Sequence, residues 1–415
     1  MPHVVFVAPR FLETTNRYLA AFARLDEVTL SVVSQDPQSS IPKAVRSRIA
    51  GHYQVRNSLD AAQLEVAVRA VSKGVGRVDR LAGALEQLQL PMAEVRDALD
   101  LDGLRVETAR RFRDKDRMKE VLRAHGVPVA KSRLVASMDA LRGYLGEIGF
   151  PAIVKPPAGF GSRATFRLTS AADLEAHVRR GMVLSEENPL QVEEMVRARE
   201  HTCETVTVRG KAVWRSGTRY FPSPLEVLET PWTQYCVLLP REEHDTEWTR
   251  FSPINEAALS ALFGPWAGTA AGTALTHMEW FLKDDGSALV NEVGARPPGV
   301  LIMPLMGLAH ETDFFHDWAE LMALDRFVPR ARRWAAGGAF FRGQGHGQRV
   351  VAVSGVPRAI EEAGSALVEL RAPKVGMARA EGYEGEGWAT VRTDTTDGAK
   401  RALRALIENV QVRYG

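Results

Sequence analysis

The chain has 415 residues, of which 45% are hydrophobic and 25% are charged, and its 53 basic and 51 acidic residues leave a net charge of +2. This composition is typical of a globular protein and lacks the strong field that would attract nucleic acid or an anionic membrane. The two cysteines, Cys203 and Cys236, are too few for a disulfide framework, so we expect a reducing, cytoplasmic location. No run of about 18 apolar residues occurs, so we expect no membrane span.

The first quarter of the chain predicts a small parallel α/β domain. HVVFVAPR (3–10) is typical of a buried strand and not of a signal peptide, FLETTNRYLAAFARL (11–25) has the apolar spacing of a helix, and VTLSVVSQDP (28–37) predicts a second strand. A strand, helix and strand in this order favour a parallel sheet. The pattern of residues 60–100 is mostly helical.

The middle of the chain predicts a helix followed by several strands. FRDKDRMKEVLRAHG (112–126) has the pattern and the terminal glycine of a helix. FPAIVKPPAGFGSRATFRL (150–168) predicts a strand, a glycine-rich turn and a strand, and residues 190–214 predict an apolar stretch and two further strands. Residues 216–255 contain several prolines without clear periodicity, so we expect a long ordered loop region. From about residue 331 the sequence predicts short strands and a final helix.

HMEWFLKDDGSALVNEVGARP (277–297) predicts two strands joined by a tight turn. Asp285-Gly286 favours a two-residue hairpin loop, because both positions need positive φ. Such a loop places Glu279 directly opposite Glu292 on one face of the hairpin. At an effective dielectric near 20, two carboxylates about 5 Å apart repel by ~3 kcal/mol. Magnesium binds through one or two carboxylates plus nucleotide phosphates, so the pair is a candidate metal site. The alternative is two glutamates on a solvated strand.

IVKPPAGFGSRAT (153–165) is a second candidate site. Lys155 ends an apolar strand just before a glycine-rich turn whose backbone N–H groups could cradle phosphates. An ordinary hairpin turn is the alternative. The turn is not a Walker A loop, because no G-x-x-x-x-G-K-[ST] motif occurs in the chain. The motifs H-E-x-x-H and G-x-S-x-G are also missing, which argues against zinc-protease and serine-hydrolase chemistry.

The ordered set of motifs resembles the ATP-grasp superfamily. It comprises a lysine at the start of the helix in RDKDRMKEVLRAHGVPV, a strand lysine before a glycine-rich turn, the acidic pair of EEMV, and the paired glutamates with NEVGARP. The likeness is greatest to the carboxylate–amine ligases, which include L-amino acid ligases. The resemblance implies an α/β (α+β) fold with an N-terminal Rossmann-like domain (1–113), an ATP-grasp domain (114–330) with a mobile lid subdomain (about 151–195), and a small C-terminal domain (331–415).

The resemblance also implies which residues bind ATP. They are Lys115, Lys155, Gly159, Gly161, Ser162, Glu193, Glu194, Val196 and Glu200. The two lysines would contact the phosphates beneath the lid loop at 159–163. Glu193 and Val196 would line the adenine, and Glu200 would hold the ribose hydroxyls. For the three glutamates, ordinary surface charge is the alternative.

The same resemblance assigns the metal site and the catalytic residues. Glu279 and Glu292 would hold Mg²⁺ or Mn²⁺, and Arg296 would face an acyl phosphate, which makes Arg296 and Lys155 the implied catalytic residues. One position departs from the usual pattern. Where the family generally has an asparagine, this sequence has Gly294, so one ordinary metal ligand is missing and the number of metal ions stays open.

The implied reaction activates a small-molecule carboxylate with ATP and couples it to an amine. Two alternatives stay open, namely a carboxylase that uses bicarbonate and a non-catalytic ATP-binding protein. The candidate substrate contacts are Arg219, His277, Arg342 and His346, each of which could instead have a structural role. A homodimer is expected from the resemblance alone, and neither nucleic acid nor membrane is an expected partner.

Overall fold

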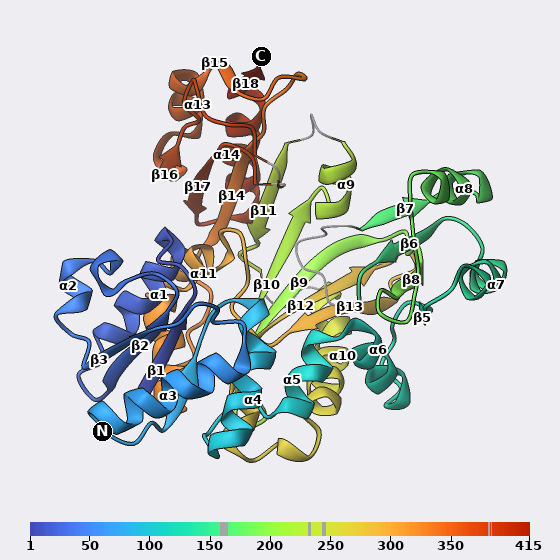
Figure 1. Cartoon of the computed structure of the whole chain (residues 1–415). Coiled ribbons are helices and arrows are strands. Elements are labelled where there is room, and N and C mark those ends of the chain that lie inside the picture. Colours follow the sequence, from blue (N-terminus) through green and yellow to red (C-terminus); the bar gives the residue numbers. More distant parts are fainter. Residues whose placement is uncertain (158–164, 231–233, 243–245, 381, 383) are drawn as a thin grey trace.

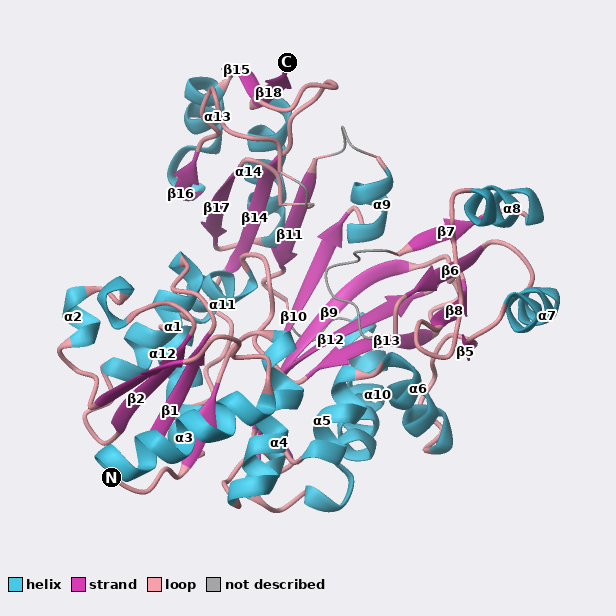
Figure 2. Cartoon of the chain, viewed as in Figure 1, coloured by secondary structure: helices cyan, strands magenta, loops and turns pink. Residues whose placement is uncertain are grey.

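The computed structural model describes residues 1–157, 165–230, 234–242, 246–380, 382 and 384–415. These residues form two four-stranded sheets, one eight-stranded sheet and one two-stranded sheet, with helices packed against them (Figures 1 and 2). Among the described residues, no helix is both long and apolar enough to cross a bilayer.

The N-terminal part is a parallel sheet with the strand order β3-β2-β1-β4. Its strands are β1 (His3–Ala8), β2 (Thr29–Ser34), β3 (Gly51–Gln54) and β4 (Arg80–Ala82). Its helices are α1 (Glu13–Ala23), α2 (Lys43–Arg46), α3 (Ala61–Val75) and α4 (Gln89–Leu99). Every residue of β1 is buried, as expected for a parallel strand covered on both faces. The predicted strand, helix and strand are therefore confirmed.

A smaller antiparallel sheet follows, and we name it the lid sheet. Its strand order is β5-β8-β6-β7. The strands are β5 (Ser132–Val135), β6 (Ala152–Lys155), β7 (Phe166–Leu168) and β8 (Leu190–Glu194), accompanied by α7 (Met138–Ile148) and α8 (Ala171–Arg179). Helices α5 (Val106–Arg113) and α6 (Lys115–Ala124) precede it. The sheet begins at residue 132, whereas the expected lid subdomain begins near 151.

The largest sheet, which we name the central sheet, has the order β13-β12-β9-β10-β11-β14-β17-β16. Its strands are β9 (Arg199–Val208), β10 (Lys211–Phe221), β11 (Tyr235–Leu239), β12 (Ala274–Leu282), β13 (Ala288–Gly294), β14 (Ala335–Phe341), β16 (Leu367–Arg371) and β17 (Gly387–Thr393). Strand β14 pairs directly with β11. The strands β14, β16 and β17, which follow residue 331, therefore continue the sheet of the preceding part.

The remaining helices and strands lie beside the central sheet, and several of the helices pack against it. They are α9 (Pro224–Glu229), α10 (Thr246–Phe263), α11 (Ile302–His310), α12 (Phe314–Leu324), α13 (Val356–Ala363), α14 (Thr396–Asn409) and the strand pair β15 (Val350–Ser354) and β18 (Gln411–Tyr414). Aromatic stacking joins α10 to the sheet, with the rings of Phe251 and Trp280 3.9 Å apart. Helix α10 therefore covers one face of β9, β12 and β13, and the opposite face of these strands is turned toward the lid sheet.

The loop predicted for residues 216–255 is wrong. This region contains the end of β10, helix α9, strand β11 and the start of α10. Strand β11 (YCVLL) is buried throughout because it lies between β10 and β14, so it shows no alternation of polar and apolar residues. Helix α10 contains Pro253, which obscures a helical pattern in the sequence.

The hairpin of β12 and β13 pairs Glu279 with Glu292 as predicted, but by a different route. The loop has three residues and not two, because the amide of Lys283 donates to the carbonyl of Ser287 and Gly286 takes a φ of +79°. Near the loop the strands are therefore one residue out of the predicted register. A bulge beside Glu279 inserts one residue into β13 and restores the predicted pairing of the two glutamates.

Candidate active site

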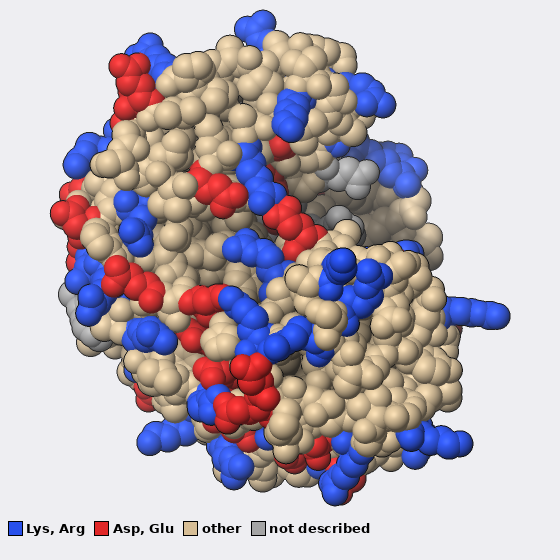
Figure 3. Space-filling model, turned by 90° about the vertical axis from the view of Figure 1, so that its left-hand side faces the viewer, with Lys and Arg blue, Asp and Glu red and all other residues tan. Residues whose placement is uncertain are grey.

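A cavity of about 900 Å³ lies between the lid sheet and the central sheet. Its volume falls within the range of protein sites that enclose small ligands. The predicted site residues that line it are Lys115, Lys155, Glu193, Glu194, Val196, Glu200, His277, Glu279, Glu292 and Arg296. Three others, namely Gly159, Gly161 and Ser162, lie outside the described residues. On the face drawn in Figure 3, the surface is hollowed and acidic and basic side chains are intermingled around it.

Strand alternation explains why one wall of the cavity is charged. Glu200 and Glu204 on β9 share a face with Glu279 on β12, since the strands pair Glu279 with the intervening Thr202. The neighbouring Cys203 points the other way, into an apolar core with α10. The sequence therefore directs its carboxylates to the cavity and its apolar side chains to the core.

An ion pair links the predicted metal ligands to the predicted phosphate contact. Lys115 lies at the start of α6, and its Nζ is 2.8 Å from Oε1 of Glu292. Asn291 donates to Glu279 over 3.3 Å. Within the described ranges, no group of three or more acidic, histidine or cysteine side chains could hold a metal ion. Two carboxylates nevertheless fit Mg²⁺, which prefers oxygen donors and usually keeps water or phosphate oxygens as its other ligands.

The carboxylates of this wall repel one another. Burial, together with the charge of Glu279, raises the pKa of Glu200 to about 8. At this pKa the carboxyl group of Glu200 is mostly protonated at pH 7, chiefly because burial disfavours its charged form. His277 and Lys115 already offset part of the charge of Glu279 and Glu292, and a bound cation would offset the rest.

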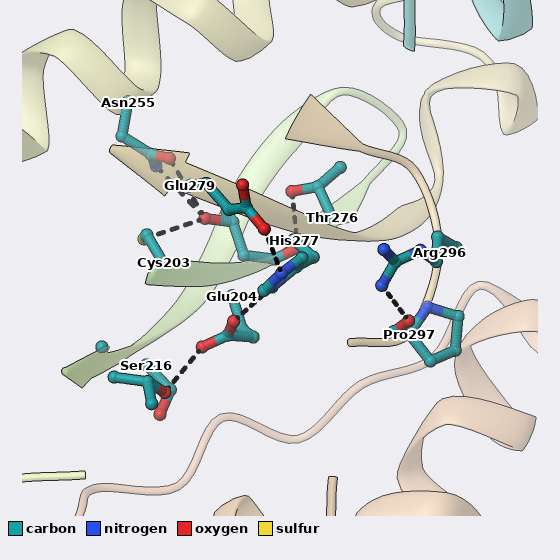
Figure 4. A network of polar contacts seen from close by, with 12 residues as sticks. Cys203, Glu204, Ser216, Asn255, Thr276, His277, Glu279, Arg296 and Pro297 are labelled. Atoms are coloured by element: carbon teal, nitrogen blue, oxygen red, sulfur yellow. Dashed lines mark hydrogen bonds and ion pairs between the residues drawn. The ribbon is translucent and has the colours of Figure 1, made fainter. Parts of the chain in front are cut away.

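His277 lies between two of these carboxylates, as Figure 4 shows. Its Nδ1 is 2.7 Å from Oε1 of Glu204, and its Nε2 is 3.7 Å from Oε1 of Glu279. Burial alone would lower the pKa of His277, but the two carboxylates raise it to about 9. The imidazole is therefore protonated at pH 7. Glu204 was not predicted, although Glu200, Thr202 and Glu204 form an alternating polar series that could have indicated it.

Arg296 is fixed by a residue from the N-terminal part of the chain. Its Nε and Nη2 donate to Oε2 of Glu86 over 3.1 and 2.9 Å, and its Nη1 donates to the carbonyl of Pro297 over 2.9 Å (Figure 4). Arg113 approaches the other oxygen of Glu86, at 3.3 Å. Glu86 lines the cavity, and no motif in the sequence indicated it.

Two lysines hold Glu193. Nζ of Lys119 is 2.6 Å from Oε1 of Glu193, and Nζ of Lys155 is 3.0 Å from Oε2. Burial alone would raise the pKa of Glu193, but the two ammonium groups lower it to about 2. Lys119 was not predicted, although it lies one helical turn after Lys115 on α6, which is a detectable spacing.

Three predicted substrate contacts lie outside the lining of the cavity. Arg219 points to the opposite face of the central sheet, with its Nη2 3.0 Å from Oε2 of Glu247 on α10. Arg342 donates to the carbonyl of Val227 over 2.7 Å and so supports the end of α9, which does line the cavity. His346 is exposed. Only His277 of the four candidates is brought into the site.

Comparison with solved structures identifies the fold. The crystal structure of L-amino acid ligase from Bacillus licheniformis superposes with a TM-score of 0.76 at 16% identity, covering 100% of this chain and 99% of that chain. The chain has the ATP-grasp fold. The predicted fold is therefore confirmed. No family model matches the chain.

Sequence relatives of the chain include ATP-grasp ligases, which agrees with the predicted resemblance. It is 26% identical over 200 residues to the L-arginine-specific L-amino acid ligase of Bacillus subtilis, which covers 47% of this chain and 47% of that protein. It is 24% identical over 202 residues to the carbamoyl phosphate synthase large chain of Mycobacterium sp. (strain JLS), and the aligned residues make up 48% of this chain. The chain matches only 15% of the length of the mycobacterial protein.

Proposed function

We propose that the protein is an ATP-dependent carboxylate–amine ligase that uses magnesium and forms an amide or peptide-like product. The observation that carries the proposal is the arrangement of charge in one cavity. Lys115 and Lys155 approach it from α6 and the lid sheet, Glu279 and Glu292 from the central sheet, and Arg296 from the loop after β13. Such a reaction needs cations that bind phosphates, carboxylates that bind a metal ion, and an arginine that contacts the transferred phosphoryl group.

The first step transfers the γ-phosphoryl group of ATP to an oxygen of the substrate carboxylate, with ADP as the leaving group. Lys115 and Lys155 neutralise phosphate charge and orient the nucleotide, because catalysis of phosphoryl transfer is mostly positioning and electrostatics. Glu279 and Glu292 would hold magnesium, which supplies further neutralisation of phosphate charge. Arg296, already oriented by Glu86, meets the phosphoryl group of the acyl phosphate.

In the second step the amine attacks the acyl carbon, the C–O bond to phosphate breaks, and inorganic phosphate leaves together with the proton that the amine nitrogen loses. This reaction requires no covalent bond between the enzyme and the substrate. Burial raises the pKa of both thiols, Cys203 and Cys236, to about 12, so neither is a thiolate at neutral pH. Closure of the lid sheet over the cavity would keep water from the acyl phosphate, which would otherwise hydrolyse.

The test is release of ADP and phosphate by the purified protein given Mg²⁺, ATP, pooled amino acids and other small carboxylates and amines, with and without bicarbonate. Release that requires an organic acid and an amine together supports the ligase, and splitting the pool names the substrates. Release with bicarbonate alone would replace the ligase by a carboxylase. ATP binding without turnover in any arm would favour a binding protein.

Two variants connect the measurement to the site. Lys155→Ala should weaken ATP binding, measured by calorimetry, because it removes a cation from the phosphate side of the cavity. Glu279→Gln should leave ATP bound but lower turnover that depends on magnesium. Normal ATP affinity in the lysine variant would contradict the proposed nucleotide position.

A further inference from the structure

Lys119 is buried completely, yet it does not line the cavity. It lies behind Glu193, which does line the cavity and which also contacts Lys155. The three side chains therefore form a row of alternating charge that runs from the interior of the protein to the cavity wall. Glu193 and Lys155 come from neighbouring strands of the lid sheet, and Lys119 comes from α6.

Stability alone does not account for this row. The attraction within a buried ion pair often fails to offset the free energy lost when both charges are removed from water. A pair of apolar side chains of similar size often makes the folded protein equally stable. Burial lowers the pKa of Lys119 to about 8 despite its contact with Glu193, which reflects the cost of keeping this ammonium group out of water. We therefore look for a function at the end of the row that reaches the cavity, where Lys155 lies.

The charges of Lys119, Glu193 and Lys155 indicate how each side chain affects the binding of phosphates at the cavity wall. Glu193 holds the ammonium of Lys155 at 3.0 Å and so fixes its position on the cavity wall. Acting alone, the carboxylate would also cancel the positive charge of Lys155 and weaken its attraction for phosphates. Lys119, at 2.6 Å from the other oxygen, offsets that carboxylate. The row as a whole keeps a net positive charge beside the cavity.

We propose that Lys119 is a positioning residue which, through Glu193, keeps Lys155 both oriented and electrostatically effective for binding the phosphates of ATP. This inference rests on the proposed function, in that ATP phosphates bind at Lys155. It gives the Glu193 side chain a different role from the adenine contact that the family resemblance implies, since both of its carboxylate oxygens face ammonium groups.

The test compares the affinity for Mg·ATP of the full chain and three variants by calorimetry. Lys119→Met removes the charge but keeps much of the volume, and it should weaken ATP binding roughly tenfold, the equivalent of about one pKa unit of charge interaction. Lys119→Arg should retain the affinity, because it retains the charge. Lys119→Met combined with Glu193→Gln should return the affinity to within about threefold of the parent, because the neutral amide no longer cancels Lys155.

This rescue separates an electrostatic role from a merely structural one, because a packing defect at Lys119 would persist in the double variant. Arg117→Met is the matched control on the exposed side of α6, and it should bind ATP as the parent does. Unchanged affinity in Lys119→Met, or a double variant no better than Lys155→Ala, would overturn the inference while leaving the proposed function intact. A parent protein that binds no ATP would overturn both. If Lys119→Met does not fold, Lys119→Gln takes its place, because it also removes the charge but can still donate a hydrogen bond to Glu193, and it should weaken ATP binding by a similar factor.

Discussion

Lys115 and Glu292 form an ion pair that joins the start of α6 to β13 across the floor of the cavity, with Nζ 2.8 Å from Oε1. The pair connects a predicted phosphate contact to a predicted metal ligand. While this ion pair is intact, the carboxylate of Glu292 offsets the positive charge of Lys115. Binding of Mg·ATP would replace one contact by two, with the carboxylate on the metal and the ammonium on a phosphate.

The first prediction concerns Glu292. Glu292→Ala should lower magnesium-dependent turnover about 100-fold or more, the scale of a single strong electrostatic contact in catalysis. ATP should still bind without metal, because loss of the Glu292 carboxylate makes the potential around Lys115 more positive. Turnover at saturating ATP is measured across a range of Mg²⁺ concentrations, with the exposed Glu120→Ala as the control. Magnesium-dependent turnover that survives in Glu292→Ala would refute the metal assignment.

Arg296 provides the second prediction. Arg296→Lys preserves the charge but loses the planar group that Glu86 holds through two nitrogens, so kcat should fall by roughly 10-fold to 100-fold while the affinity for ATP stays the same. Steady-state assays measure kcat and calorimetry measures the affinity for ATP, so the two effects are separated. Arg113→Lys is the matched control, because Arg113 also contacts Glu86 but does not line the cavity. Equal losses in both variants would argue for a structural role of Glu86 and its partners.

The third prediction concerns closure of the cavity. Nη2 of Arg167 on β7 lies 2.7 Å from Oε2 of Glu229 on α9, and this ion pair joins the lid sheet to the opposite wall. Arg167→Ala should change the free energy of unfolding by no more than about 1 kcal/mol, because the pair is partly exposed. It should increase ADP release in the absence of an amine, because water reaches the acyl phosphate more often.

Arg142→Ala is the control for that experiment, since Arg142 pairs with Glu175 within the lid region and does not reach α9. Hydrogen exchange of β6 and β7 should be faster in Arg167→Ala than in this control. Equal rates of exchange, together with equal amine-independent ADP release, would show that the pair does not hold the lid sheet.

Local patterns in the sequence were sufficient to predict several elements of the site. The strand ending at Lys155 and the helix starting at Lys115 are local features, and both lie where the motifs placed them. The opposition of Glu279 and Glu292 was also predicted, although the three-residue loop and the bulge are two deviations that happen to cancel. A bulge depends on how β13 packs against its neighbours, and a single sequence contains no signal for that.

The partners of the site residues could not be predicted in the same way. Glu86 meets Arg296 across 210 positions of sequence, and Lys119 meets Glu193 across 74, so only the folded topology brings them together. Arg342 was a candidate substrate contact with a structural role as the alternative, and its guanidinium donates to the backbone at the end of α9, which fits the structural role. Long-range contacts of this kind are decided by packing and not by local pattern.

The last prediction concerns stability at acidic pH, away from the cavity. His310 is buried; its Nδ1 lies 2.9 Å from the carbonyl of Arg330, and since a carbonyl only accepts, this nitrogen carries the proton. Burial and the charge of Arg332 lower the pKa of His310 to about 3. Because the folded pKa lies below the ordinary value near 6.5, the unfolded chain binds the proton first as the pH falls. Stability from this group is therefore complete above about pH 6.5 and declines progressively toward pH 3.

His310→Gln removes this titration. Between pH 7 and pH 5 the free energy of unfolding of the parent should fall by up to about 2 kcal/mol more than that of the variant. Denaturant unfolding at a series of pH values measures the difference, and His346→Gln at an exposed position is the control that should follow the parent. Parallel pH profiles for the parent and His310→Gln would mean that the folded protein accepts a proton on His310, which its burial beside Arg332 argues against.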